Sequence, residues 1–170
     1  MWQAVNSLVD RFSRMLAYLS GGAILLIAIM QMAEIVLRNG AGISLPFVWE
    51  YASYLHVSAI FLGAAFTLRT DGHIRVTLIR GLNPRLFEIL ATVVGLAISA
   101  YLTKALFGLA WGYGITGRTS GTINNVPLVI PAIFVSAGAV MLTLQLALRL
   151  VQALIGSPLV VPWNETSRAD

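Results

Sequence analysis

Four long runs of apolar residues constrain this chain more than any other feature, because each is long enough to cross a lipid bilayer as a helix. The first, residues 15–37, has 37 − 15 + 1 = 23 residues, which rise roughly 34 Å at about 1.5 Å each. Three more runs follow at residues 47–68, 86–113 and 127–150. Since 58% of the residues are hydrophobic and only 11% are charged, the sequence predicts an all-α membrane protein with a single four-helix domain over residues 1–155.

Three further segments are predicted to lie outside the bilayer core. Residues 2–14 have apolar and polar sides, which predicts an N-terminal interfacial helix. A secretory signal is the alternative, but the following apolar run is too long and has no cleavage site after it. A basic amphipathic segment between the second and third spans is expected to rest on the anionic inner leaflet, and residues 156–170 to form a short cytoplasmic tail. The predicted inner-leaflet anchors are Arg69, His73, Arg75, Arg80 and Arg85.

The distribution of basic residues predicts the topology. Four spans put both termini on one side, and if that side is cytoplasmic, eight of the 11 basic residues lie inside. Only Arg38 and Arg118 then lie outside, and Lys104 lies within the membrane. This excess follows the positive-inside rule and predicts cytoplasmic termini. The net charge of +4 therefore needs no nucleic-acid partner, and no nucleic-acid motif accompanies it.

The second and third spans carry small and polar residues in rows. Wound at 100° per residue, Trp49, Ser53 and His56 share one narrow stripe of the second span, whereas Leu62 and Ala65 lie opposite. Small and polar side chains mediate helix association in lipid, so this stripe is predicted to meet protein, either other helices of this chain or another subunit. The candidate seam or partner contacts are Trp49, Glu50, Ser53, His56, Gly63, Gly108 and Gly112.

Three ionisable residues are candidates for ion pairs within the membrane. Glu34 and Arg38 have the i, i+4 spacing of a helical ion pair. Lys104 lies inside the third span and needs a carboxylate, a carbonyl or a route to the surface, and we expect either Glu34 or Glu50 to pair with it. The alternative is a self-sufficient small exporter that uses Glu34 as a proton-exchanging carboxylate. The nearby Arg38 and the basic inner segment argue against that alternative.

Enzymatic and cofactor functions are not expected. The chain has no cysteine, which excludes disulfides and thiolate chemistry, and its two histidines do not stand at metal-ligand spacing with carboxylates. Nor does it contain a recognisable set of nucleophile, base and orienting residue. Arg118, in a polar outer loop, is instead a candidate contact for a periplasmic partner.

Several motifs, in order, carry a family resemblance. The chain has Trp49-Glu50, then Phe61-Leu62-Gly63-Ala64-Ala65, then Arg69, Gly72, His73-Ile74 and Val76, with Arg38 before them and Pro127, Gly138, Leu144-Gln145 and Arg149 after them. Together these resemble the small membrane (Q) subunit of tripartite ATP-independent periplasmic (TRAP) transporters, the DctQ-like family. Such sequences often have two acidic residues after the tryptophan, whereas Tyr51 follows Glu50 here, so no role of a second carboxylate is assigned.

The resemblance implies an accessory subunit in the bacterial inner membrane that pairs with a large multi-span M subunit. In that family the large subunit carries the substrate and sodium sites and moves as an elevator, while the small subunit enlarges the fixed scaffold. A periplasmic substrate-binding protein delivers an organic acid to the outer face. Sodium coupling is thus expected in the large subunit, and this chain is expected to need membrane lipid but no cofactor.

Overall fold

The structure is a computed structural model that describes residues 2–70 and 84–155. Within these residues it contains four helices: α1 (Trp2–Ala41), α2 (Phe47–Arg69), α3 (Pro84–Thr116) and α4 (Val129–Ile155). All four are long and apolar enough to cross a membrane. The predicted all-α membrane fold with four spans is therefore confirmed.

Helix boundaries follow from glycine and proline. Two helices end just before a glycine in the left-handed region: Gly42 (φ 68°) follows α1 and Gly117 (φ 61°) follows α3. Glycine adopts this conformation without a Cβ penalty, so it is suited to ending a helix. At the other end of α3, Pro84 occupies the first helical position, where its missing N–H costs no hydrogen bond.

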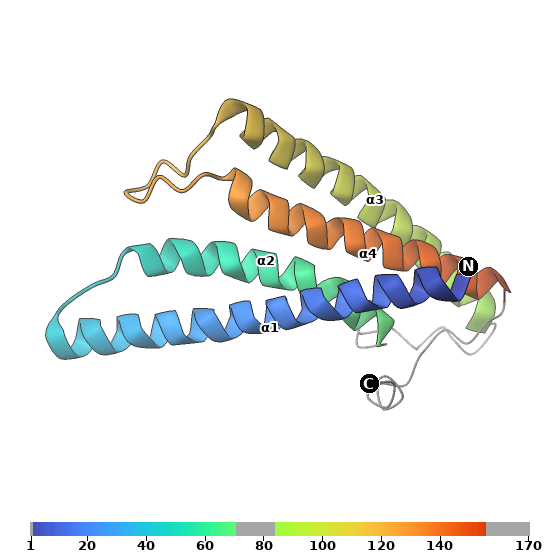
Figure 1. The fold of residues 1–170 in the computed structure, drawn as a ribbon, viewed down its shortest axis with the longest axis horizontal. Helices are drawn as coiled ribbons and strands as arrows, with labels where there is room; N and C mark the ends of the chain where they lie inside the picture. The colour runs from blue at the N-terminus through green and yellow to red at the C-terminus, as the bar shows by residue number, and fades with distance from the viewer. Residues whose placement is uncertain (1, 71–83, 156–170) are drawn as a thin grey trace.

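The helices lie side by side in the order α1, α2, α4, α3 rather than around a central core (Figure 1). α2 packs against α1 on one side and α4 on the other, and α4 packs against α3. Among the described helices, α3 contacts α4 alone, and only a small contact joins α1 to α4. The fold is therefore a layer in which α2 and α4 are central and α1 and α3 form the two edges.

The contact between α2 and α4 is the tightest in the layer. A Cβ atom placed on Gly138 would lie 2.4 Å from the carbonyl carbon of Phe61, far inside van der Waals contact. Ala65 and Ala139 are also fully or almost fully buried. Small residues thus let the two backbones touch, as is typical of helix pairs in lipid.

α1 differs from the prediction of a separate interfacial helix over residues 2–14. It runs without interruption from Trp2 to Ala41, because the chain has no glycine or proline between Arg14 and Ser20 to break it. Val9 and Ser13 in this segment are buried against protein. Val9 and Ser13 therefore bring this part of α1 into the helix layer.

The remaining predicted surface segments cannot be followed in the structure. The basic segment with His73, Arg75 and Arg80 and the tail 156–170 lie outside the described residues. Arg85 lies in the first turn of α3.

Candidate functional site

A polar cluster lies at the end of the layer where α1 joins α2 and α3 joins α4; the predicted topology makes this the outer end, and we call it the outer cluster. Glu34 on α1 is only 2% exposed, and its carboxylate accepts hydrogen bonds from the Ser44 hydroxyl (3.0 Å) and the Leu45 backbone N–H (2.5 Å). This carboxylate therefore closes the α1–α2 turn.

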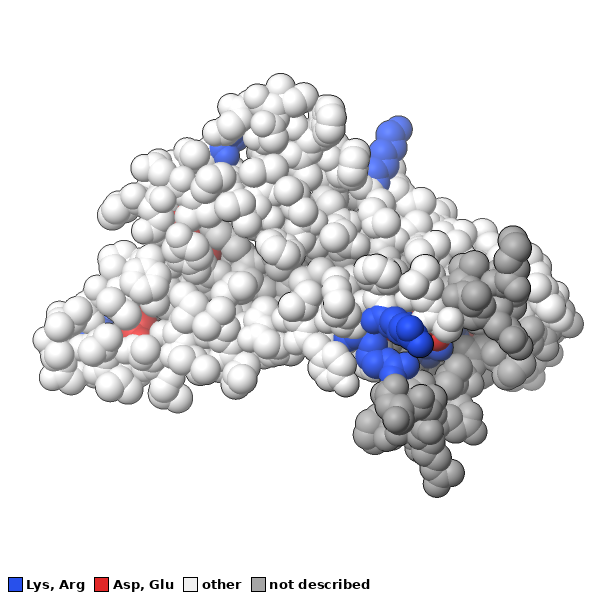
Figure 2. Space-filling model, in the orientation of Figure 1, with Lys and Arg blue, Asp and Glu red and all other residues white. Residues whose placement is uncertain are grey.

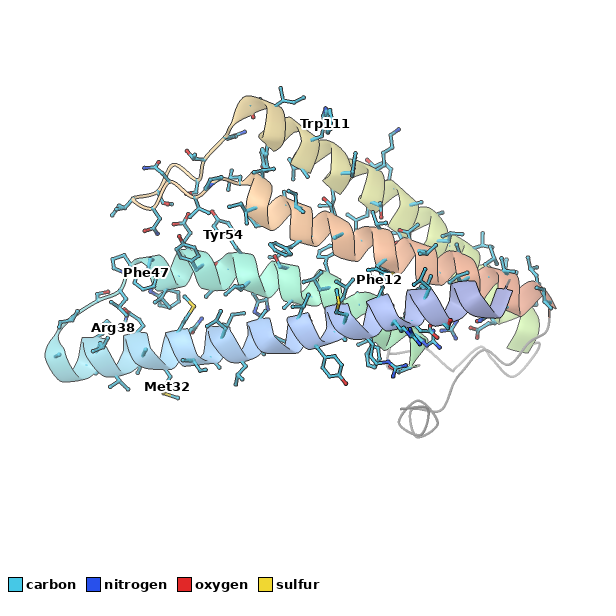
Figure 3. All side chains as sticks on the ribbon, in the orientation of Figure 1. Phe12, Met32, Arg38, Phe47, Tyr54 and Trp111 are labelled. Atoms are coloured by element: carbon cyan, nitrogen blue, oxygen red, sulfur yellow. The ribbon has the colours of Figure 1, made fainter. Side chains whose placement is uncertain are left out.

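The predicted ion pair between Glu34 and Arg38 is not formed. Arg38 lies on α1 near the turn with an exposed side chain (Figure 3), while both carboxylate oxygens of Glu34 are engaged by the turn itself. The i, i+4 spacing permits a pair, but the Ser44 hydroxyl and the Leu45 N–H already bond the two carboxylate oxygens.

Glu50 forms the second half of the outer cluster. Its carboxylate accepts hydrogen bonds from the Thr122 hydroxyl (2.7 Å), the Asn124 amide (2.6 Å) and the Tyr54 hydroxyl (3.1 Å). Tyr54 extends from α2 toward the α3–α4 loop (Figure 3). Glu50 thus fastens that loop to α2. Sequence reasoning missed Thr122 and Asn124, because they lie more than seventy residues away in the chain.

An inner polar cluster lies at the opposite end of the layer. Arg69 on α2 pairs with Asp10 on α1. Arg149 on α4 donates a hydrogen bond from Nε to Glu88 Oε1 of α3 (3.0 Å) and forms an ion pair with the same oxygen through Nη2 (2.8 Å), and its Nη1 donates to the Leu68 carbonyl of α2 (3.1 Å). In Figure 2 the largest group of basic side chains lies at this end with acidic atoms beside it, whereas most of the surface along the helices is uncharged.

One further bond completes the inner cluster. The Gln145 side-chain N–H donates to the Ser13 hydroxyl over 2.9 Å and joins α4 to α1, and both residues are buried. Asp10 and Glu88 were not among the predicted site residues, although each is an acidic residue near a span end opposite arginines, which is a usable signal. The inner cluster therefore connects all four helices.

The distance between the two clusters matches a bilayer. Glu50 and Arg69 are 69 − 50 = 19 residues apart on α2, which corresponds to about 28 Å of helix. The hydrocarbon core of a bilayer is about 30 Å thick. The separation of the two clusters therefore fits the thickness of the hydrocarbon core.

The predicted polar stripe of α2 does not face the chain's own helices. Trp49, Ser53 and His56 are exposed, and the face buried in the layer is the opposite one, with Ser58, Leu62 and Ala65. Of the stripe, Gly63 is in contact with a neighbouring helix: a Cβ there would lie 3.0 Å from the Ser20 hydroxyl of α1. The alternative in which Ser53 and His56 pack inside this chain is therefore wrong.

Lys104 also lies away from its predicted partners. Ser136 bonds the Leu106 carbonyl (3.0 Å), and Gly138 touches Phe61, so Lys104 is at about the depth of Phe61. Phe61 is 11 residues from Glu50 and 8 from Arg69, about 16 and 12 Å along α2. Lys104 thus lies between the two clusters, somewhat nearer the inner one, and not in the outer half as predicted. Glu34 is on α1, which does not contact α3, and Glu50 is held by the loop.

A shallow groove runs along α3 beyond Lys104. Gly108 and Gly112 have no atom within 4 Å of a Cβ built on them, and they line a groove of about 440 Å³ that ends at Arg118. Arg118 is exposed, and its backbone carbonyl accepts a bond from Leu128 N–H (3.0 Å). The small row predicted on α3 is therefore open on its outer side.

Within residues 2–70 and 84–155, no three His, Asp or Glu side chains gather as metal ligands. No curated protein and no solved structure matches the chain significantly. The sequence does match the family model for tripartite ATP-independent periplasmic transporters, DctQ component, over residues 25–156. Because this match covers most of the chain, the protein belongs to the DctQ family and is a small membrane subunit of a TRAP transporter.

Proposed function

We propose that this subunit is a static scaffold for the large M subunit of a sodium-coupled TRAP transporter that imports an organic acid. Membership of the DctQ family makes the chain a multi-pass inner membrane protein and a component of a transporter, which is not an enzyme family. The observation that carries the scaffold proposal is that the four helices are cross-linked by polar bonds at both membrane surfaces.

These bonds leave little freedom for one helix to slide past another. At the outer surface, Glu34 holds the α1–α2 turn and Glu50 holds the α3–α4 loop. At the inner surface, Arg69 joins α2 to α1, and Arg149 joins α4 to both α2 and α3. Breaking a buried ion pair by moving one partner away costs about 3–5 kcal/mol. A layer bonded in this way is suited to stay fixed while another subunit moves.

The transport sites then belong to the large subunit. In this proposal that subunit binds sodium and the organic acid, and a periplasmic binding protein delivers the acid at the outer surface. Arg38 and Arg118 are exposed at that surface and are the candidate contacts for either partner. The predicted cytoplasmic position of both termini gives this orientation, with the Arg69–Asp10 and Arg149–Glu88 pairs on the inner side.

The exporter alternative has less support. A proton-exchanging carboxylate must be accessible from one side of the membrane and then from the other. Glu34 is buried, and a backbone N–H and a hydroxyl hold its two oxygens. Its geometry is that of a structural group that closes a turn.

A disulfide between α1 and α2 tests the scaffold proposal. The chain has no cysteine of its own, so S20C and G63C would introduce a defined pair. The Cβ of Ser20 lies 3.5 Å from a Cβ built on Gly63, within the separation that a disulfide requires. The complex with the large subunit would be reconstituted in proteoliposomes with the binding protein, and sodium-driven uptake of radiolabelled organic acid measured before and after oxidation.

A static scaffold predicts equal uptake rates in the oxidised and reduced double variant, and each single variant serves as a control for the substitutions. Loss of uptake on oxidation, restored by a reductant, would show that α1 and α2 move during transport and would refute the proposal. Proton-coupled efflux by this chain alone, abolished by E34Q, would establish the exporter instead.

A further inference from the structure

We propose that the outer edge of α3 is the surface on which the large membrane subunit docks, and that Lys104 pairs there with a carboxylate of that subunit near the middle of the membrane. The inference rests on the proposed function for the identity of the partner. It goes further by choosing one edge of the layer and stating the chemistry that recognises it.

Lys104 has no anionic partner within the described part of this chain. α3 is the last helix of the layer and uses one side to contact α4, where Ser99 and Thr103 bond the Thr143 hydroxyl (2.7 and 2.8 Å). Lys104 is the next residue after Thr103, but its side chain is exposed. None of the described carboxylates lies within 4 Å of its ammonium group. Its charge is therefore directed out of the layer.

The depth of Lys104 makes contact with lipid alone unfavourable. A charged side chain at the bilayer centre is costly, and such residues almost always face protein or a water-filled cavity. Lysines near helix ends reach the membrane surface by extending their stems, but Lys104 lies about 12 Å from the inner cluster and about 16 Å from the outer one, measured along the helices. A four-carbon stem is shorter than either distance. The charge therefore requires an anion that another protein brings to this depth.

The surface around Lys104 permits the close approach of a helix. Gly108 and Gly112 lie one and two turns further along α3, and no atom of another described residue lies within 4 Å of a Cβ built on either of them. Tyr101 and Trp111 are 77% and 66% exposed on the same helix, and Trp111 projects from the edge away from α4 (Figure 3). Glycines allow backbone contact in lipid, and aromatic side chains provide large apolar contact areas.

The exposed polar stripe of α2 has less need of a partner subunit than Lys104. On α2, Ser53 and Thr67 donate to backbone carbonyls of their own helix, at 2.8 and 2.9 Å, so both hydroxyls are already satisfied. His56 next to them is exposed, and its imidazole can be satisfied by hydrogen bonds without a counter-charge. An ammonium group needs a counter-charge, whereas these hydroxyl and imidazole groups do not. We therefore assign the docking edge to α3 and not to α2.

The first test removes the charge and keeps the length of the side chain. K104M, K104R and the unchanged chain would each be co-expressed with the large subunit, and the ratio of large to small subunit would be measured after purification in mild detergent. Interhelical polar contacts in membranes contribute up to 1–2 kcal/mol, so K104M should lower the recovered complex by about tenfold. K104R should retain it. An unchanged ratio for K104M would refute the pairing.

The second test maps the edge directly. A benzophenone maleimide would be attached to Y101C, one turn from Lys104, and to L25C, which is 63% exposed on α1 at the opposite edge of the layer. Irradiation of the complex should join Y101C to the large subunit and L25C mainly to lipid. Capture of lipid alone at Y101C, or of the large subunit at L25C alone, would overturn the proposal. If the unchanged chain recovers no large subunit at all, the proposed function fails as well.

Discussion

Replacing Gly138 with alanine should push α2 and α4 apart. The added Cβ would lie 2.4 Å from the Phe61 carbonyl carbon and 2.8 Å from the Leu62 backbone nitrogen, whereas carbon contacts are normally about 3.5–4.0 Å. Backbone atoms cannot rotate away as a side chain can, so the helices must separate by about 1 Å, a gap that forfeits about half of each contact's attraction.

The expected change in the free energy of unfolding is the sum of two opposing effects. Overpacking of this kind costs about 1–3 kcal/mol, and we expect the upper end because only backbone atoms can yield. Alanine is better than glycine in a helix by roughly 0.5–1 kcal/mol, which offsets part of the loss. The free energy of unfolding should therefore fall by about 2 kcal/mol.

Unfolding in mixed micelles with increasing SDS, followed by far-UV circular dichroism, measures this change. G22A is the matched control, since Gly22 on α1 has nothing within 4 Å of a built Cβ. That variant should be unchanged or slightly more stable. If G138A unfolds at the same SDS mole fraction as G22A, the backbone contact between α2 and α4 does not exist as described.

Further substitutions test the two polar clusters and the α3–α4 loop. R149M should lower stability by up to about 3 kcal/mol in the same SDS titration, because it leaves the Glu88 carboxylate, whose side chain is 14% exposed, without its cation, and adding E88M should restore part of the loss; equal stability of R149M and the unchanged chain would contradict the inner cluster. E34A should cost about 1–3 kcal/mol by leaving the Leu45 N–H and Ser44 hydroxyl unpaired, with a smaller loss for E34Q, which keeps an acceptor; an equal loss for the two would argue against the hydrogen bonds at Glu34. R118E should weaken binding of the periplasmic protein to the reconstituted complex, measured by surface plasmon resonance, without altering the SDS titration; unaltered binding would remove this loop from the interface.

The number and positions of the spans could be predicted because they depend on apolar length alone. The predicted spans 47–68 and 127–150 differ little from α2 (Phe47–Arg69) and α4 (Val129–Ile155). The start of α1 differs from the prediction in that residues 2–14 continue into the first span without a break, and amphipathic character alone does not distinguish a helix on a membrane surface from one whose apolar side packs on protein. Val9 and Ser13 are buried by α1's neighbours, which the sequence of α1 does not contain.

The orientation of α2 could not be predicted from polarity. A serine or threonine in a helix can bond a carbonyl of its own preceding turn, as Ser53 and Thr67 do, and then needs no neighbour. Buried contacts in the layer depend instead on small size, at Ala59, Ala65 and Gly138. The partners of Glu34 and Glu50 were missed for a different reason: they lie in turns whose path is fixed only by the folded chain.

A layer one helix thick and four helices wide has a mechanical consequence. With neighbouring axes about 8–10 Å apart, three intervals place the two edges at α1 and α3 at most about 24–30 Å from each other across the layer. A force applied at one edge therefore acts on a long lever arm, and the lipids along both broad sides oppose any rotation of the plate. A compact bundle of equal mass would offer a shorter arm, so in the proposed scaffold role a plate of this shape would resist rotation in the bilayer better than a bundle.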